Sequence, residues 1–179
     1  MALVVENGTG ISGANSYITE AESETLLQAH PKADEWCAIG TDEKEIALRA
    51  GLIYLDRRFR WYGNPAMIGS QEVQWPRTKL YDDLGQLIAT GTIPTQLKKA
   101  QAELAVELAC DPSLQVTTVD EAGVITNWST DGVSVTFSAE SGMEMAITGK
   151  RFPSVEFLVK SIGVLRDLDD LEIKKIEGI

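Results

Sequence analysis

The chain has 179 residues, enough for one domain with a substantial core, and its 44% hydrophobic and 24% charged residues are typical of a soluble globular protein. No apolar run is long enough to span a bilayer and the first residues lack a basic leader, so neither a membrane segment nor a signal peptide is expected. The net charge of −11 opposes binding to a phosphate backbone unless the basic residues gather on one face.

Three helices are predicted in the first 110 residues. Thr19 and Glu22 fit a capping box, so the first helix should begin there and end near His30. Thr41 caps the second helix, and Pro94 opens a third that should end near Cys110. The second helix carries two apolar stripes at helical spacing, which predict a central, buried helix. The stripes are Leu48, Leu52, Leu55 and Phe59, and Ile46, Ala50 and Ile53.

The hydrophobic period changes after the third helix. Residues 133–137 alternate apolar and polar side chains, which predicts a half-buried strand. Asp131-Gly132 is a hairpin turn signal, with residues 124–128 as the partner strand. Pro153 then opens a last helix whose apolar stripe runs to Leu165.

The predicted fold class is therefore α+β. We expect mainly a helical bundle, with a β-hairpin or small antiparallel sheet after the third helix, then a final helix and an extended C-terminal tail. A single domain should cover residues 1–166, with a helical part over about 17–110, a β part over about 115–148 and the last helix over about 153–166. Residues 167–179 form the tail.

No motif predicts a catalytic, cofactor or metal site. Residues 8–13 match the G-x-G-x-x-G pattern, but a dinucleotide site needs a helix that opens at the glycines, and the predicted helix begins only near Thr19. His30 is the only histidine, which excludes clusters of two imidazoles. Cys37 and Cys110 form no metal or redox pair, which favours a reduced, cytosolic setting. Catalytic sites that use only Asp and Glu side chains remain possible, but no spacing in the sequence singles out such a set of residues. We therefore expect a non-enzymatic protein.

The basic residues are partly segregated in the sequence. Between Arg57 and Lys79 there are five bases and one acid, whereas residues 111–179 hold twelve acids and six bases. The five bases are candidate contacts for an acidic partner, with a solvated face as the alternative reading: Arg57, Arg58, Arg60, Arg77 and Lys79. Trp61, Tyr62 and Trp75 lie among them, a combination that single-stranded-DNA binders also use.

The last residues, 167–179, are short and highly charged, with too few apolar side chains to fold alone. Leu171 and Ile173 stand two residues apart, which suits an extended strand added to a partner's sheet edge. The candidate docking residues are Asp167, Leu171, Ile173 and Ile176. A frayed terminus is the alternative.

Two blocks of the sequence resemble a phage and prophage family. Residues 5–10 and 13–17 are similar to its N-terminal signature. A second block continues the similarity to about residue 110: Trp75-Pro76-Arg77, Asp83-Leu84-Gly85, Ile93-Pro94, Ala100 and Glu103-Leu104-Ala105. This family carries the label of DnaT-like single-stranded-DNA-binding proteins, and its members also resemble head–tail connector (adaptor) proteins.

The resemblance to connectors implies a structural virion protein, a head–tail adaptor beneath the portal of a tailed phage. It implies a ring of about twelve copies that contacts the portal protein and downstream stopper or tail-terminator proteins, with genomic DNA passing through the lumen without specific binding. The protein would stay in the host cytoplasm before assembly and in the virion neck afterwards, without membrane contact. The acidic composition favours this reading over the alternative, a single-stranded-DNA-binding replication accessory protein.

Overall fold

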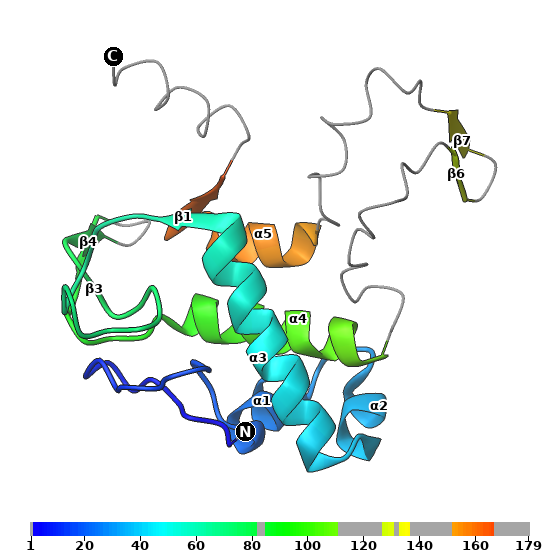
Figure 1. The fold of residues 1–179 in the computed structure, drawn as a ribbon, viewed down its shortest axis with the longest axis horizontal. Coiled ribbons are helices and arrows are strands. Elements are labelled where there is room, and N and C mark those ends of the chain that lie inside the picture. The colour runs from blue at the N-terminus through cyan, green and yellow to red at the C-terminus, as the bar shows by residue number, and fades with distance from the viewer. Residues whose placement is uncertain (1, 82–84, 111–126, 131–132, 137–151, 167–179) are drawn as a thin grey trace. The chain divides into compact units, whose positions relative to one another are not determined.

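The structure, a computed structural model, describes residues 2–81, 85–110, 127–130, 133–136 and 152–166. It separates into two compact units, each described by itself. One unit joins Met1–Asp111 to Phe152–Ile179, and the other is Pro112–Arg151. The regular elements of the described residues are helices and short antiparallel strand pairs, which confirms the predicted α+β class (Figure 1).

Five helices lie in the described part of the first unit. They are α1 (Glu20–Leu26), α2 (Ala33–Ala38), α3 (Thr41–Arg58), α4 (Thr95–Cys110) and α5 (Pro153–Val159). The capping box that begins α1 is confirmed, because Thr19 Oγ1 accepts from the Glu22 amide and the Glu22 carboxylate accepts from the Thr19 amide. Helix α1 ends at Leu26, earlier than predicted, and α2 was not predicted at all.

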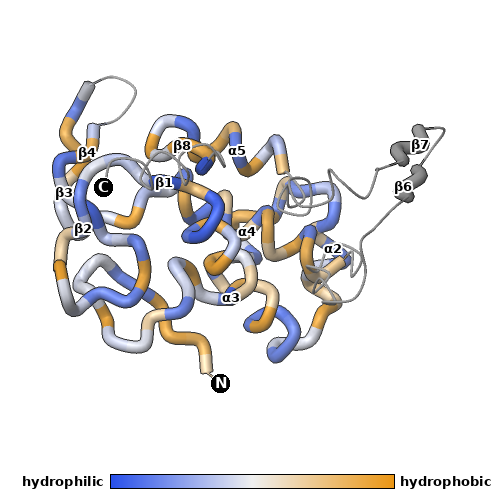
Figure 2. The backbone as a smooth tube through the Cα atoms, turned by 45° about the horizontal axis from the view of Figure 1, so that its top comes forward, coloured by the Kyte–Doolittle hydropathy of each residue, from blue (hydrophilic) through white to orange (hydrophobic). Residues whose placement is uncertain are grey.

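The central helix is α4, and the prediction that α3 would be buried around most of its circumference is wrong. Helix α4 contacts α1, α2, α3 and α5, and hydrophobic positions run along it in Figure 2. By contrast, α3 buries one stripe, while Ile46 and Ile53 of the other stripe are 58% and 46% exposed. The buried residues of α4 are Leu97, Ala100, Gln101, Ala102, Leu104, Ala105, Val106 and Leu108.

Small side chains and one buried amide join α3 to α4. Gly51 permits the close approach, since a Cβ there would lie 3.3 Å from the Gln101 carbonyl oxygen. The Gln101 side chain is fully buried and donates to Ser16 Oγ at 2.9 Å and to the Leu48 carbonyl at 2.8 Å. Its oxygen accepts from the Tyr17 amide at 2.9 Å. Gln101 therefore connects the N-terminal loop to both long helices.

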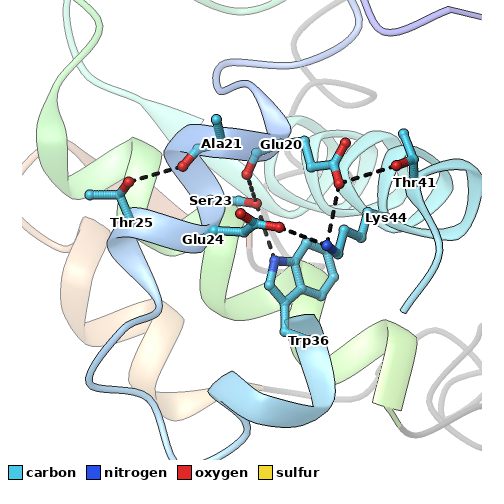
Figure 3. A network of polar contacts seen from close by, with 8 residues as sticks. All are labelled: Glu20, Ala21, Ser23, Glu24, Thr25, Trp36, Thr41 and Lys44. Atoms are coloured by element: carbon cyan, nitrogen blue, oxygen red, sulfur yellow. Dashed lines mark hydrogen bonds and ion pairs between the residues drawn. The ribbon is translucent and has the colours of Figure 1, made fainter. Parts of the chain in front are cut away.

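A polar network fixes the first half of α3 against α1 and α2 (Figure 3). The buried Lys44 Nζ lies 2.7 Å from Glu24 Oε1 and 3.3 Å from Glu20 Oε1, and 6.0 Å from the centre of the Trp36 ring. The hydrogen bond to Glu24 raises the pKa of Lys44. Trp36 Nε1 donates to Ser23 Oγ at 3.2 Å, so α2, although only six residues long, is anchored by its one buried tryptophan.

The strands of the first unit pair two by two, always antiparallel. β1 pairs with β8, β2 with β3, and β4 with β5. Their bounds are Phe59–Trp61 (β1), Asn64–Pro65 (β2), Arg77–Thr78 (β3), Leu80–Tyr81 (β4), Leu87–Ile88 (β5) and Gly163–Leu165 (β8). Within the part of the chain that the structure describes, no helix is both long and apolar enough to cross a membrane.

The predicted last helix is too long. Helix α5 begins at Pro153 as expected but ends at Val159, and the next residues form β8. Gly163 makes this pairing sterically feasible, because a Cβ there would lie 2.7 Å from Cε3 of Trp61 and 3.2 Å from the Arg60 carbonyl oxygen. A strand partner about a hundred residues away therefore overrides the helical spacing of the apolar residues.

The described part of the second unit is an antiparallel pair of strands, which confirms the predicted hairpin. Strand β6 (Asn127–Thr130) pairs with β7 (Val133–Thr136), and Trp128 lies opposite Val135. The first of these strands lies later in the chain than the predicted residues 124–128. The Asp131-Gly132 turn and most of the expected β part lie outside the described residues, as does the tail at 167–179.

Candidate nucleic-acid interface

Two sequence-distant segments without acidic residues meet in the β1–β8 ribbon. The segment 57–62 contains three arginines, and 160–166 contains one lysine and one arginine. The register places Phe59 opposite Leu165, Arg60 opposite Val164 and Trp61 opposite Gly163. Backbone hydrogen bonds extend the ribbon at both ends. The Tyr62 amide donates to the Ile162 carbonyl at 3.0 Å, and the Arg166 amide donates to the Arg58 carbonyl at 2.9 Å. Figure 2 labels the two strands side by side.

Alternation along the two strands separates an outward from an inward face. Arg60 is exposed and lies directly opposite Val164, which is 38% exposed. Tyr62 and Arg166 stand two residues further along their segments and are also exposed, Tyr62 by 47%. We call the outward set of Arg60, Tyr62, Val164 and Arg166 the ribbon face. It offers the exposed guanidinium groups of Arg60 and Arg166, of which Arg166 donates through Nε to the Phe59 carbonyl oxygen at 3.1 Å, and one exposed aromatic ring.

Aromatic packing supports the ribbon from beneath. The rings of Phe59 and Trp61 on the inward side stack with centroids 5.5 Å apart, and Trp61 meets Trp75 edge to face at 5.8 Å. Phe59 and Trp61 are 1% and 4% exposed, and Trp75 is fully buried. Trp61 and Trp75 therefore belong to the core, and Tyr62 is the member of the predicted aromatic group that is open to a ligand.

Arg77, a predicted partner contact, is used inside the fold. Its side chain is buried, with Nε 2.7 Å from the Tyr62 carbonyl, Nη1 3.0 Å from that of Gln74 and Nη2 2.9 Å from that of Gly63. Burial lowers the pKa of this guanidinium. Arg77 thus holds the segment after β1 in place, and its guanidinium is not presented to a partner.

The other predicted contacts lie at several places. Arg57 is exposed and Arg58 half-buried at the end of α3, and Arg60 is on the ribbon face. Lys79 is exposed between β3 and β4 with a positive φ of 56°. The four tail candidates lie outside the described residues. They are Asp167, Leu171, Ile173 and Ile176.

Sequence reasoning missed Arg166 as a neighbour of the arginine cluster and Lys160 at the start of the segment that leads into β8. Both follow the expected helix start at Pro153, and the expected helix gave no reason to bring Arg166 to the end of α3. The signal that could have indicated a break in the helix was Gly163, a weak helix former in the apolar segment between Lys160 and Arg166.

Asp56, the acid next to this basic cluster in sequence, is turned inward. Its carboxylate accepts from the Tyr17 hydroxyl at 2.8 Å and from the Gln74 amide at 3.0 Å. Burial raises the pKa of Asp56, and these hydrogen bonds and the nearby Arg166 oppose the rise. Burial, followed by the charge of Asp56, raises the pKa of Tyr17 well above its usual value. The pair is a buried structural contact beneath the ribbon.

Charge is polarised along α3. Its first turn carries Asp42 and Glu43 and its last turn Arg57 and Arg58, and 18 residues of helix separate these ends by about 27 Å. That distance is several times the screening length of about 8 Å at physiological salt. The described residues hold 14 acids and 12 bases, a net −2, so most of the chain's −11 belongs to sequence outside them.

The glycine-rich N-terminal loop is filled by a side chain of its own. The Glu6 carboxylate is buried and accepts from the amides of Gly8 at 2.7 Å, Gly10 at 2.9 Å and Ile11 at 2.8 Å. These are the amides that a phosphate would need in such a loop. An acid in that position opposes nucleotide binding there. Among the residues described, no group of three or more His, Cys, Asp and Glu side chains could hold a metal ion.

Comparison with known proteins gives one family. A family model with the description "Putative DnaT-like ssDNA binding protein" matches residues 1–167. No curated protein and no solved structure matches the chain.

Proposed function

We propose that this chain, since it belongs to the family of DnaT-like ssDNA binding proteins, binds single-stranded DNA on its ribbon face. The observation that carries the proposal is the pairing of β1 with β8, which joins two basic, acid-free segments around an exposed tyrosine. Proteins that bind single strands without sequence preference combine cations that follow the phosphates with aromatic rings on which bases stack.

The family match corrects the interpretation of the chain as a structural head–tail adaptor of a virion. The matched family is described by DNA binding, and the comparisons give no likeness to a head–tail connector protein. The net charge of −11 did not exclude DNA binding, because most of it belongs to sequence outside the described residues, whose 14 acids and 12 bases give a net −2. The ring, the portal and tail partners and the virion location rested on that interpretation and stay untested.

The ribbon face predicts affinity of mainly electrostatic origin. Arg60, Arg166 and the adjacent Arg57 offer three cations, and each phosphate contact on a single strand contributes about 0.7 to the slope of log affinity against log salt. The expected slope is therefore about −2, and a fourfold rise in salt should weaken binding roughly 20-fold. A stacked base on Tyr62 should add about 1–3 kcal/mol that depends little on salt.

Fluorescence anisotropy with a labelled oligothymidylate tests this proposal. The double variant Arg60→Ala/Arg166→Ala should weaken binding about 10- to 30-fold, at roughly 1 kcal/mol per lost surface contact, and should reduce the salt slope by about 1.4. A control, Lys32→Ala/Lys99→Ala, removes the same charge from the connection before α2 and from α4. If both double variants lose the same affinity, the ribbon face is not the site; if the unmodified protein does not bind the strand, the proposed function is wrong.

A further inference from the structure

A second exposed aromatic ring lies on α5, just before the ribbon. The helix buries Val155 and Val159 on one side, and on the other Phe157 is 68% exposed. Lys160 is also exposed and places its Nζ 4.0 Å from the centre of the Phe157 ring. The pair is a cation–π contact at the surface rather than part of the core.

The chain leads directly from this pair to the ribbon face. Ile162 stands two residues after Lys160 and immediately before β8, and its carbonyl accepts from the Tyr62 amide at 3.0 Å. An exposed aromatic residue with a lysine or arginine within three positions thus occurs twice in adjoining segments. The two sets are Arg60 with Tyr62 and Lys160 with Phe157.

Two contacts compete for the Phe157 ring, the Lys160 ammonium group and a nucleic-acid base, and their energies favour the nucleic-acid base. An exposed cation–π contact contributes about 0.5–1 kcal/mol. Stacking of a nucleic-acid base on an aromatic side chain contributes about 1–3 kcal/mol. A base can therefore displace Lys160 from the ring, and the ammonium group then becomes available to the adjacent phosphate without leaving the site.

We propose that Phe157 is a second base-stacking position for single-stranded DNA, with Lys160 as the cation that covers the ring in the free protein and contacts a phosphate in the complex. This rests on the proposed function and extends it: the strand continues from Tyr62 on the ribbon to Phe157 on α5. The chemistry requires a planar base and a phosphate but no particular base sequence.

Three substitutions at residue 157 separate stacking from mere apolar bulk. Phe157→Leu and Phe157→Ala should each weaken binding of oligothymidylate about 5- to 150-fold, the equivalent of one lost stack. Phe157→Trp should bind at least as tightly as the unmodified protein. With Lys160 as a fourth phosphate contact the salt slope should be about −2.8, and Lys160→Ala should return it to about −2.1. The control is Ile46→Ala on α3, which removes another large apolar side chain that is 58% exposed and should not change binding.

The outcomes distinguish this inference from the proposed function. If the unmodified protein binds and Arg60→Ala/Arg166→Ala weakens it, but Phe157→Leu binds normally, the second stacking position is refuted and the ribbon face stands. Thermal melting of each variant should match the unmodified protein, because the side chain is exposed; equal losses in Phe157→Trp and Phe157→Leu would likewise refute stacking.

Discussion

Replacing Gly163 by alanine perturbs the β1–β8 ribbon without changing the charge of the protein. The added Cβ would lie 2.7 Å from Cε3 of Trp61 and 3.2 Å from the backbone oxygen of Arg60, closer than either neighbour allows. Trp61 is buried, stacked on Phe59 and in edge-to-face contact with Trp75, so it has little room to yield. Overpacking of this kind costs about 1–3 kcal/mol.

That cost should appear in two assays. For a domain of this size the melting temperature should fall by roughly 3–10 °C. Affinity for a single-stranded oligonucleotide should fall toward the value of the double arginine variant, because Arg60 and Arg166 separate when the strands do. Gly40→Ala is the control, since an added Cβ there meets nothing closer than 3.8 Å. A Gly163→Ala protein with unchanged melting and unchanged affinity would refute the β1–β8 register.

Two further predictions concern the buried polar groups beneath the site. Gln101→Leu keeps the side-chain volume but leaves the buried Tyr17 amide unpaired, so it should lower the free energy of unfolding, measured by chemical denaturation, by about 1–3 kcal/mol. The control is Gln96→Leu, exposed on the same helix, which should lower it by less than about 0.5 kcal/mol. Burial raises the pKa of Asp56, so the folded protein retains this proton where the unfolded chain has lost it, and the contribution of Asp56 to stability falls as pH rises above about 4. Thermal melting of the unmodified protein and of Asp56→Asn should be compared at pH 4 and at pH 7. The unmodified protein should lose stability relative to the variant as the pH rises. The same stability difference between the two proteins at both pH values would contradict the buried position of Asp56.

The parts of the fold that depend on neighbouring residues could be predicted from the sequence. Thr19 and Glu22 cap α1 by contacts three residues apart, and the apolar stripe of α4 marks a face that the helix does bury. The hairpin of β6 and β7 follows from alternation and a turn signal within ten residues. In each case the evidence lies within one element or one turn of the chain.

The errors arise where distant contacts decide the structure. The spacing of apolar residues after Pro153 suits a helix, but Gly163 and the partner strand β1 turn its second half into β8. Periodicity identified two apolar stripes on α3 but could not tell that only one would meet a neighbour, which leaves Ile46 and Ile53 exposed. Helix α2 is short, and its anchor is the single residue Trp36.

The candidate site divides in the same way. The arginines at 57, 58 and 60 could be found from charge alone, because they are consecutive or nearly so. Charge could not distinguish Arg77, which binds backbone carbonyls inside the fold, from Arg60, which is exposed. Arg166 joins the cluster only through strand pairing across more than a hundred residues.

Photocrosslinking can locate the stacked bases on the protein. An oligonucleotide that carries 5-iodouracil, bound to the full chain, transfers a covalent mark to an aromatic side chain against which the base stacks. We expect peptide mapping to place the marks at Tyr62 and Phe157, with loss of the first in Tyr62→Leu and of the second in Phe157→Leu. Marks confined to α1, α2 or the Glu6 loop, or no marks under conditions in which the strand is bound, would contradict the assignment of the ribbon face as the single-stranded-DNA interface.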